Sequence, residues 1–228
     1  MNKLLHGVVR SVAESFDLPQ PIIEVGSYQV EGQHDIIELR HLFPGKKYIG
    51  MDFRTGPGVD ITASVEELPL ADNSVGTIIA MSTFEHVRHF WRGFAEVQRV
   101  LKPGGAFLLS TPFYFYIHNY PADYWRFTPQ AFEILLEDFP QRIFGWHGTP
   151  KRPENVWSLA FKEGGPPVSP PQFERYKSLL GQYANQPLRP WRVARYKLAS
   201  LFVGRGPFAN YLDQSRWETE LRTAPARA

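Results

Sequence analysis

IIEVG at residues 22–26 is a short apolar run that ends in glycine, and VGTIIAM at residues 75–81 is a second, longer run. Neither run alternates apolar with polar residues. A strand that is apolar at successive positions is buried on both faces of its sheet. The two runs therefore predict central strands of a mostly parallel sheet. Gly26 predicts a tight turn directly after the first strand.

Stretches with the apolar spacing of helices alternate with apolar runs along the chain. The spacing predicts helices over residues 32–43, 85–101 and 128–139, and the runs predict further strands over residues 47–51, 59–62, 106–111, 142–146 and 156–161. This alternation predicts an α/β fold, a doubly wound Rossmann-like sheet with helices on both faces. Ligands of such folds bind beyond the carboxyl ends of the strands, so the residues that follow each strand are the candidate site.

Charge and composition divide the chain unevenly. Residues 1–162 contain 15 Lys and Arg against 18 Asp and Glu, whereas residues 163–228 contain 10 against 5. The segment at 163–171 includes GGPPVSPP, which favours neither a helix nor a central strand. We therefore expect a domain at 1–162, a Gly/Pro-rich linker at 163–171 and a basic helical extension at 172–228 that ends in disorder beyond residue 215.

The composition excludes several kinds of site. The chain has no cysteine, which rules out disulfides, zinc-thiolate sites and cysteine nucleophiles. No apolar run approaches the roughly 18 residues that a membrane-spanning helix needs. The N-terminus has no long apolar core typical of a signal peptide, so we expect a cytoplasmic protein.

Gly26 and Asp52 stand at the predicted ends of two neighbouring strands. Free N–H groups after Gly26 would favour an anionic group, and a carboxylate at Asp52 can accept hydrogen bonds from both hydroxyls of a ribose. A simple turn glycine and a surface aspartate are the alternative. A dinucleotide fingerprint would need glycines at positions 28 and 31, where Tyr28 and Glu31 stand. This difference argues against a nicotinamide-dependent oxidoreductase.

Six segments in a fixed order carry a family resemblance. They are IIEVG at 22–26, YIGMD at 48–52, EELPLADNS at 66–74, IIAM at 78–81, EHV at 85–87 and RVLKPGG at 99–105. With them the chain resembles the class I S-adenosylmethionine-dependent methyltransferases over roughly residues 20–162. Further segments resemble a bacterial small-molecule or glycan-type subgroup with GSxQVEGQ, LFPGKxYIGMD, GPGVD and YPxDYWRFTP. Each segment is weak alone, but the ordered set is highly specific.

The resemblance implies a seven-stranded sheet with an antiparallel last strand and S-adenosyl-L-methionine at its carboxyl edge. It implies O-methylation of a small molecule or glycan. By position it assigns Glu24, Gly26 and Ser27 to the methionine end of the donor and Asp52 to the ribose. It assigns Phe53, Ser64 and Val65 to the adenine, and Met81 and Ser82 to the sulfonium.

Two positions depart from the family pattern. Tyr28 replaces the second glycine, and no acid stands near Ser64 where the family commonly binds the adenine amino group. The alternative is therefore a catalytically inactive methyltransferase-like protein that serves as a binding partner or scaffold.

The residues after the fourth and fifth main strands are the candidate acceptor site. His86 follows one strand, and His118 lies in an aromatic and polar loop after the next. A hydroxyl acceptor needs a base, and His118 with Asp123 or Tyr124 could supply a base and its orienting group. The alternatives are local packing for His86 and a lid over the donor for the loop. His86 and His89 have i, i+3 spacing but no evident third ligand, and His89 is expected on a solvent face, so we expect no metal.

Residues 189–205 combine five basic residues with apolar ones and predict an amphipathic helix. It could pack on the body, or bind an anionic surface such as membrane lipid, a phosphorylated glycan carrier or nucleic acid. The acidic body makes nucleic acid the least favoured of these. Binding to lipid would place the protein peripherally on the inner face of the membrane.

Overall fold

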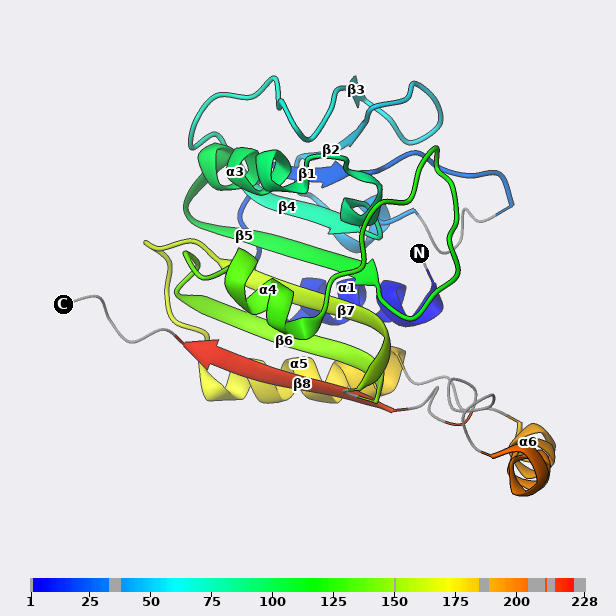
Figure 1. Cartoon of the computed structure of the whole chain (residues 1–228). Coiled ribbons are helices and arrows are strands. Elements are labelled where there is room, and N and C mark those ends of the chain that lie inside the picture. The colour runs from blue at the N-terminus through cyan, green and yellow to red at the C-terminus, as the bar shows by residue number, and fades with distance from the viewer. Residues whose placement is uncertain are drawn as a thin grey trace.

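The computed structural model describes residues 2–32, 38–149, 151–184, 189–204, 212 and 216–223. It contains one eight-stranded sheet in the order β3-β2-β1-β4-β5-β7-β6-β8 (Figure 1). The first five strands in that order pair in parallel and the last three pair antiparallel. In chain order the strands are β1 Ile22–Val25, β2 Tyr48–Asp52, β3 Ile61–Thr62, β4 Val75–Met81, β5 Leu101–Pro112, β6 Gln141–Thr149, β7 Arg152–Phe161 and β8 Trp217–Thr223.

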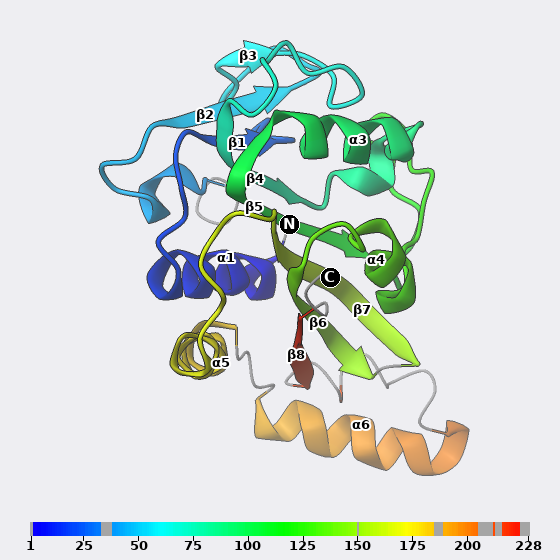
Figure 2. The same ribbon diagram turned by 90° about the vertical axis from the view of Figure 1, so that its left-hand side faces the viewer.

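Helices cover both faces of the sheet, as predicted (Figure 2). Neighbouring apolar residues of one strand serve opposite faces: Ile78 packs in a core with α3 and α4, and Ile79 packs in a core with α1 and α5. The helices are α1 Lys3–Ser15, α3 Phe90–Val100, α4 Pro129–Leu135, α5 Pro170–Tyr183 and α6 Pro190–Val203, with 3-10 turns η1 Arg40–Leu42 and η2 Phe84–His86. No helix in the described part of the chain is long and apolar enough to cross a bilayer.

Two predicted helices differ from the structure. Of the helix expected over residues 32–43, residues 33–37 lie outside the described ones, and the rest contains only η1. The apolar spacing there reflects the burial of Leu39 and Phe43 rather than a continuous helix. The helix expected from Glu85 begins at Phe90. Its start is interrupted because the Glu85 carbonyl accepts hydrogen bonds from the backbone N–H groups of Tyr124 and Trp125, at 2.8 and 3.2 Å.

The C-terminal region contributes to the same sheet. β8 pairs antiparallel with β6, where helix or disorder was expected, and adds an eighth strand. Trp217 and Leu221 pack on the core of the α1 face. The expected linker ends early because Ser169 caps α5 with a capping box. The buried Tyr176 of α5 accepts a 2.9 Å hydrogen bond from Trp157 Nε1 in β7.

Candidate functional site

A cleft of about 870 Å³ opens at the carboxyl edge of the parallel strands. Loops after β1, β2, β4 and β5 form its walls, so the topology brings together segments far apart in the sequence. All nine predicted donor-site residues line it, namely Glu24, Gly26, Ser27, Asp52, Phe53, Ser64, Val65, Met81 and Ser82. Of the predicted catalytic residues, His86, His118 and Tyr124 also line it.

Gly26 makes the turn that opens the cleft. Its φ of +84° lies in the left-handed region, and its N–H donates to the Met51 carbonyl at 2.8 Å. A Cβ at this position would lie 2.3 Å from Thr83 Oγ1. Thr83 Oγ1 in turn donates to the Val25 carbonyl at 3.0 Å. Both the conformation and the lack of space therefore require glycine here.

Asp52 ends β2 with only 4% of its surface exposed. Its Oδ2 accepts from the Tyr28 N–H at 3.3 Å, and its Oδ1 accepts from the backbone N–H and Nε of Arg54 at 2.9 and 3.2 Å. The Arg54 guanidinium lies 4.2 Å from the centre of the Tyr28 ring. Arg54 is thus a part of the site that the sequence did not identify, and Tyr28, noted there as a departure from the family pattern, is a part of it too.

Glu24 is half-buried and lines the cleft. Its Oε2 accepts a 2.8 Å hydrogen bond from the Tyr48 hydroxyl. Burial raises the pKa of Glu24 to about 7, and the Tyr48 hydrogen bond opposes this shift. The carboxyl group can therefore change its charge near neutral pH.

Two further walls differ in chemistry. The Phe53 ring is 50% exposed and lines the cleft, which leaves apolar surface for a flat ligand. Val65 is buried beside Ser64 on the same cleft. At the end of β4, Ser82 has a positive φ of 54°, and its N–H donates to the Ser110 carbonyl at 2.9 Å. Few non-glycine residues adopt this conformation.

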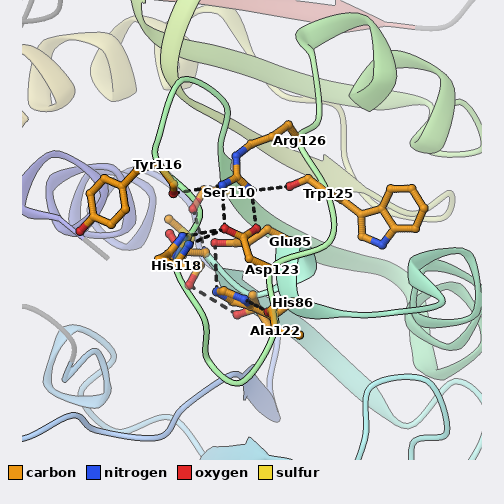
Figure 3. A network of polar contacts seen from close by, with 12 residues as sticks. Glu85, His86, Ser110, Tyr116, His118, Ala122, Asp123, Trp125 and Arg126 are labelled. Carbon is orange, nitrogen blue, oxygen red and sulfur yellow. Dashed lines mark hydrogen bonds and ion pairs between the residues drawn. The ribbon is translucent and has the colours of Figure 1, made fainter.

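The loop after β5 holds a charged network (Figure 3). Arg126 binds both carboxylate oxygens of Asp123, and its Nη2 lies 2.7 Å from Oδ2. The His118 backbone N–H donates to the same Oδ2 at 2.9 Å, and His118 Nδ1 lies 2.9 Å from it without hydrogen-bond alignment. Burial raises the pKa of Asp123, but the hydrogen bonds outweigh it and lower that pKa to about 2.

The four predicted catalytic residues are brought together but hold different positions. Asp123 is behind His118 rather than on the cleft surface, with 1% of its side chain exposed. His86 Nδ1 lies 2.5 Å from the Ala122 carbonyl, and burial lowers the pKa of His86. The rings of His86 and His118 lie edge to face at 4.9 Å. Tyr124 is 49% exposed at the rim.

Glu85 is a site residue that sequence reasoning missed. It is fully buried, and neither carboxylate oxygen accepts a hydrogen bond from another described residue. Burial raises the pKa of Glu85 to about 8. The sequence offered one sign of this burial, because Glu85 is an acid inside the apolar segment TFEHV. His89, expected on a solvent face of a helix, instead precedes α3 and contacts Glu66 at 2.7 Å.

The comparisons with known proteins agree with this arrangement. Residues 39–109 match the family model described as "Methyltransferase domain". An uncharacterized methyltransferase of Mycobacterium bovis is 43% identical over 61 residues, which cover 27% of this chain and 24% of the relative. A relative named "Probable S-adenosylmethionine-dependent methyltransferase" from Mycolicibacterium smegmatis is 36% identical over 77 residues, covering 29% and 30%.

A solved structure shares the fold. The SAM-dependent methyltransferase structure from Archaeoglobus fulgidus is similar with a TM-score of 0.54 at 13% identity, covering 70% of this chain and 93% of that one. The chain spans only about a quarter of the length of the curated mycobacterial relatives that head the comparison. The family match over residues 39–109 and the mostly parallel sheet with its edge cleft agree with the fold of the class I S-adenosylmethionine-dependent methyltransferases.

Proposed function

We propose that this protein is an S-adenosylmethionine-dependent methyltransferase that methylates an oxygen atom of a small molecule or glycan. The observation that carries the proposal is the convergence of the Gly26 turn and the Asp52 carboxylate on one cleft. The bacterial small-molecule or glycan subgroup, suggested by resemblance, supports the acceptor class by analogy.

The residues present fit the methyl donor. A carboxylate can accept about four hydrogen bonds. Tyr28 and Arg54 donate three hydrogen bonds to Asp52, so one acceptor position remains for a ribose hydroxyl. The exposed Phe53 ring offers a stacking face for adenine. Glu24 offers a carboxyl group for the cationic methionine end. When bound, S-adenosylmethionine would supply an electrophilic methyl group on a sulfonium.

The acceptor would enter between the Glu85–His86 segment and the loop after β5. Phe115, Tyr116 and Tyr120 line that side of the cleft and give it apolar walls with polar edges. Holding an acceptor in line with the donor contributes up to about 7–11 kcal/mol to lowering the barrier. An alcohol oxygen must also lose its proton, and we assign this task to the histidine pair His86 and His118.

A second candidate is a binding or scaffold protein without catalysis. One observation favours it: Arg54 already occupies part of the Asp52 carboxylate. Titration calorimetry with S-adenosylmethionine and with S-adenosylhomocysteine separates the two proposals. Binding of both ligands supports the enzyme; folded protein that binds neither supports the scaffold. Incorporation of tritiated methyl groups from donor into cell extract then identifies the acceptor.

We also propose that α6 binds an anionic membrane surface, on the cytoplasmic side. No residue of α6 is buried, and the helix lies apart from the sheet in Figures 1 and 2. Trp191, Leu201 and Phe202 are 53%, 79% and 82% exposed. Arg192 and Arg195 add positive charge beside these apolar groups.

Co-sedimentation with vesicles tests the α6 proposal. We expect binding to vesicles that contain phosphatidylglycerol, loss of binding at high salt, and loss in an Arg192→Glu/Arg195→Glu variant. The proposal would be contradicted if the protein bound neutral phosphatidylcholine vesicles as strongly as the anionic ones, or if it bound only an oligonucleotide.

A further inference from the structure

Three side chains capable of ligating metal meet at the acceptor side of the cleft. One ligand atom from each of Glu85, His86 and His118 lies within 4.8 Å of the other two. The His86 Nε2 atom is 3.8 Å from Glu85 Oε1. Figure 3 shows the three residues gathered next to Asp123 and Arg126, with contributions from the segment after β4 and the loop after β5.

Glu85 is the observation that points to a ligand. A fully buried carboxyl group whose oxygens accept no hydrogen bond from another described residue is costly in its charged form, and buried carboxylates are normally paired or bound to metal. Arg126 attracts the charged form of Glu85 but does not hydrogen-bond it, because both of its terminal nitrogens bind Asp123 and backbone carbonyls of Trp125 and Tyr116. The two oxygens of Glu85 are therefore available to a cation.

The two histidines are oriented as metal ligands usually are. Since carbonyls accept but do not donate, the Ala122 carbonyl fixes the proton of His86 on Nδ1. This leaves Nε2 with a free lone pair toward Glu85. His118 is held by its backbone N–H, which donates to Asp123 Oδ2 at 2.9 Å, and its ring Nδ1 lies 2.9 Å from the same oxygen without hydrogen-bond alignment. Metal-binding histidines commonly have such carbonyl or carboxylate partners behind them.

We propose that Glu85, His86 and His118 bind a divalent first-row transition metal such as Zn²⁺. Two imidazoles and one carboxylate suit zinc or iron better than Mg²⁺ or Ca²⁺, which prefer oxygen ligands. Bonds of about 2.0–2.2 Å in a tetrahedral site place ligand atoms about 3.4 Å apart, so side-chain movements of about 1 Å complete the geometry. All three residues line the cleft.

This site deepens the proposed function and rests on it for its chemical role. With a cation bound, His86 and His118 would serve as its ligands in place of acting as bases. The cation would make a bound acceptor hydroxyl more acidic, and the proton would pass to solvent water. The acceptor oxygen then forms a bond to the methyl carbon as the carbon–sulfur bond of the donor breaks, and the electron pair of that bond stays on sulfur. The metal itself is unchanged.

Metal binding to the full chain tests the proposal directly. Chelator-treated protein is titrated with Zn²⁺ by calorimetry and with Co²⁺ by visible absorption. We expect one ion per chain, and at least tenfold weaker binding in Glu85→Gln and in His118→Ala. His89→Ala is the matched control, because His89 contacts Glu66 away from the cluster, and it should bind as the wild type does. Circular dichroism confirms that each variant is folded.

The outcomes separate this proposal from the proposed function. No stoichiometric binding by the folded wild type, or binding by Glu85→Gln and His118→Ala equal to that of His89→Ala, overturns the metal site. S-adenosylhomocysteine binding is measured on the same samples. Product binding without metal binding refutes the metal site alone, whereas metal binding without product binding refutes the proposed function alone.

Discussion

The backbone N–H of Tyr28 lies 3.3 Å from Asp52 Oδ2, so the loop after β1 is tied directly to the carboxylate that ends β2. This contact joins the two loops on which the donor proposal depends. Tyr28 stands at the position of the family's second glycine, and its ring packs under Arg54, which also binds Asp52. The tyrosine therefore contributes to holding the carboxylate in place at the cleft.

Replacing Asp52 by Asn should weaken donor and product binding. A hydrogen bond to a charged group is worth about 1.5–3 kcal/mol, so we expect roughly 10- to 100-fold loss of affinity by calorimetry. Asp60→Asn is the control, because Asp60 binds the Gly50 N–H and Arg40 outside the cleft lining. Unchanged affinity in Asp52→Asn would refute the ribose assignment.

Replacing Gly26 by Ala should destabilise the protein and impair the cleft. The left-handed conformation costs a side chain about 1–2 kcal/mol, and crowding against Thr83 adds about 1–3 kcal/mol. Gly45 has a similar φ of +75° but nothing within 4 Å of an added Cβ. The difference in unfolding free energy between Gly26→Ala and Gly45→Ala isolates the contact with Thr83. Equal losses in both variants would show that this contact is unimportant.

Donor affinity should rise with pH through about 7. The pKa of Glu24 is raised to about 7 by burial, so its carboxyl group becomes an anion that attracts the cationic methionine end only above that pH. Affinity follows the ionised fraction, which gives an increase of up to about tenfold between pH 6 and pH 8. Calorimetry at both pH values checks this. Glu24→Gln should show no such increase, and a rise of the same size in that variant would exclude Glu24 as the cause.

The same residue makes the unliganded protein less stable as pH rises. The folded pKa of Glu24 lies above its unfolded value of about 4.5, so the folded state binds more protons between these values. The stabilisation of the folded state that comes from proton binding to Glu24 is complete below about pH 4.5 and is lost as pH rises to about 7. Thermal melting at pH 5.5 and 8 should therefore show a smaller loss in Glu24→Gln than in the wild type. Equal losses would exclude this contribution.

Asp123→Asn should destabilise the loop after β5. Breaking a buried ion pair typically costs about 3–5 kcal/mol, and we expect about 3 kcal/mol because the Arg126 side chain is 23% exposed. The pKa of Asp123 is lowered to about 2, so this stabilisation is present above about pH 3.8 and is lost as pH falls toward 2. Asp72→Asn, which affects an exposed pair with Arg99, should change stability little. Denaturant unfolding measures both variants, and similar small losses would contradict the prediction.

Sequence predicted the parts of the site that local pattern determines. Gly26 and Asp52 follow apolar strands, and parallel strands bring their carboxyl ends to one edge, so the cleft and its main residues could be placed in advance. Glu85 was missed although it is an acid inside an apolar segment, because the segment alone does not show its contact with a distant loop whose Tyr124 and Trp125 N–H groups bind its carbonyl. No local spacing encodes such a contact.

The C-terminal strand was missed for a related reason. Trp217, Thr219 and Leu221 alternate with Glu218 and Glu220, which is a two-residue period. The stretch is short, and its charged residues made it resemble a solvated tail. Only pairing with the edge of β6 makes it a strand.

The contact between α5 and the sheet gives the last prediction. Tyr176→Phe removes the acceptor of the Trp157 Nε1 hydrogen bond, and both side chains are fully buried. An unsatisfied buried donor costs about 1–3 kcal/mol, so the melting temperature of the whole domain should fall in a single transition. Tyr183→Phe is the control on the same helix, because its hydroxyl binds the exposed Glu14 and its loss should change stability little. If Tyr176→Phe instead melts in two steps and the sheet keeps its wild-type transition, residues 170–183 fold independently of the sheet. A single shared transition means that α5 belongs to the cooperative core that supports the cleft.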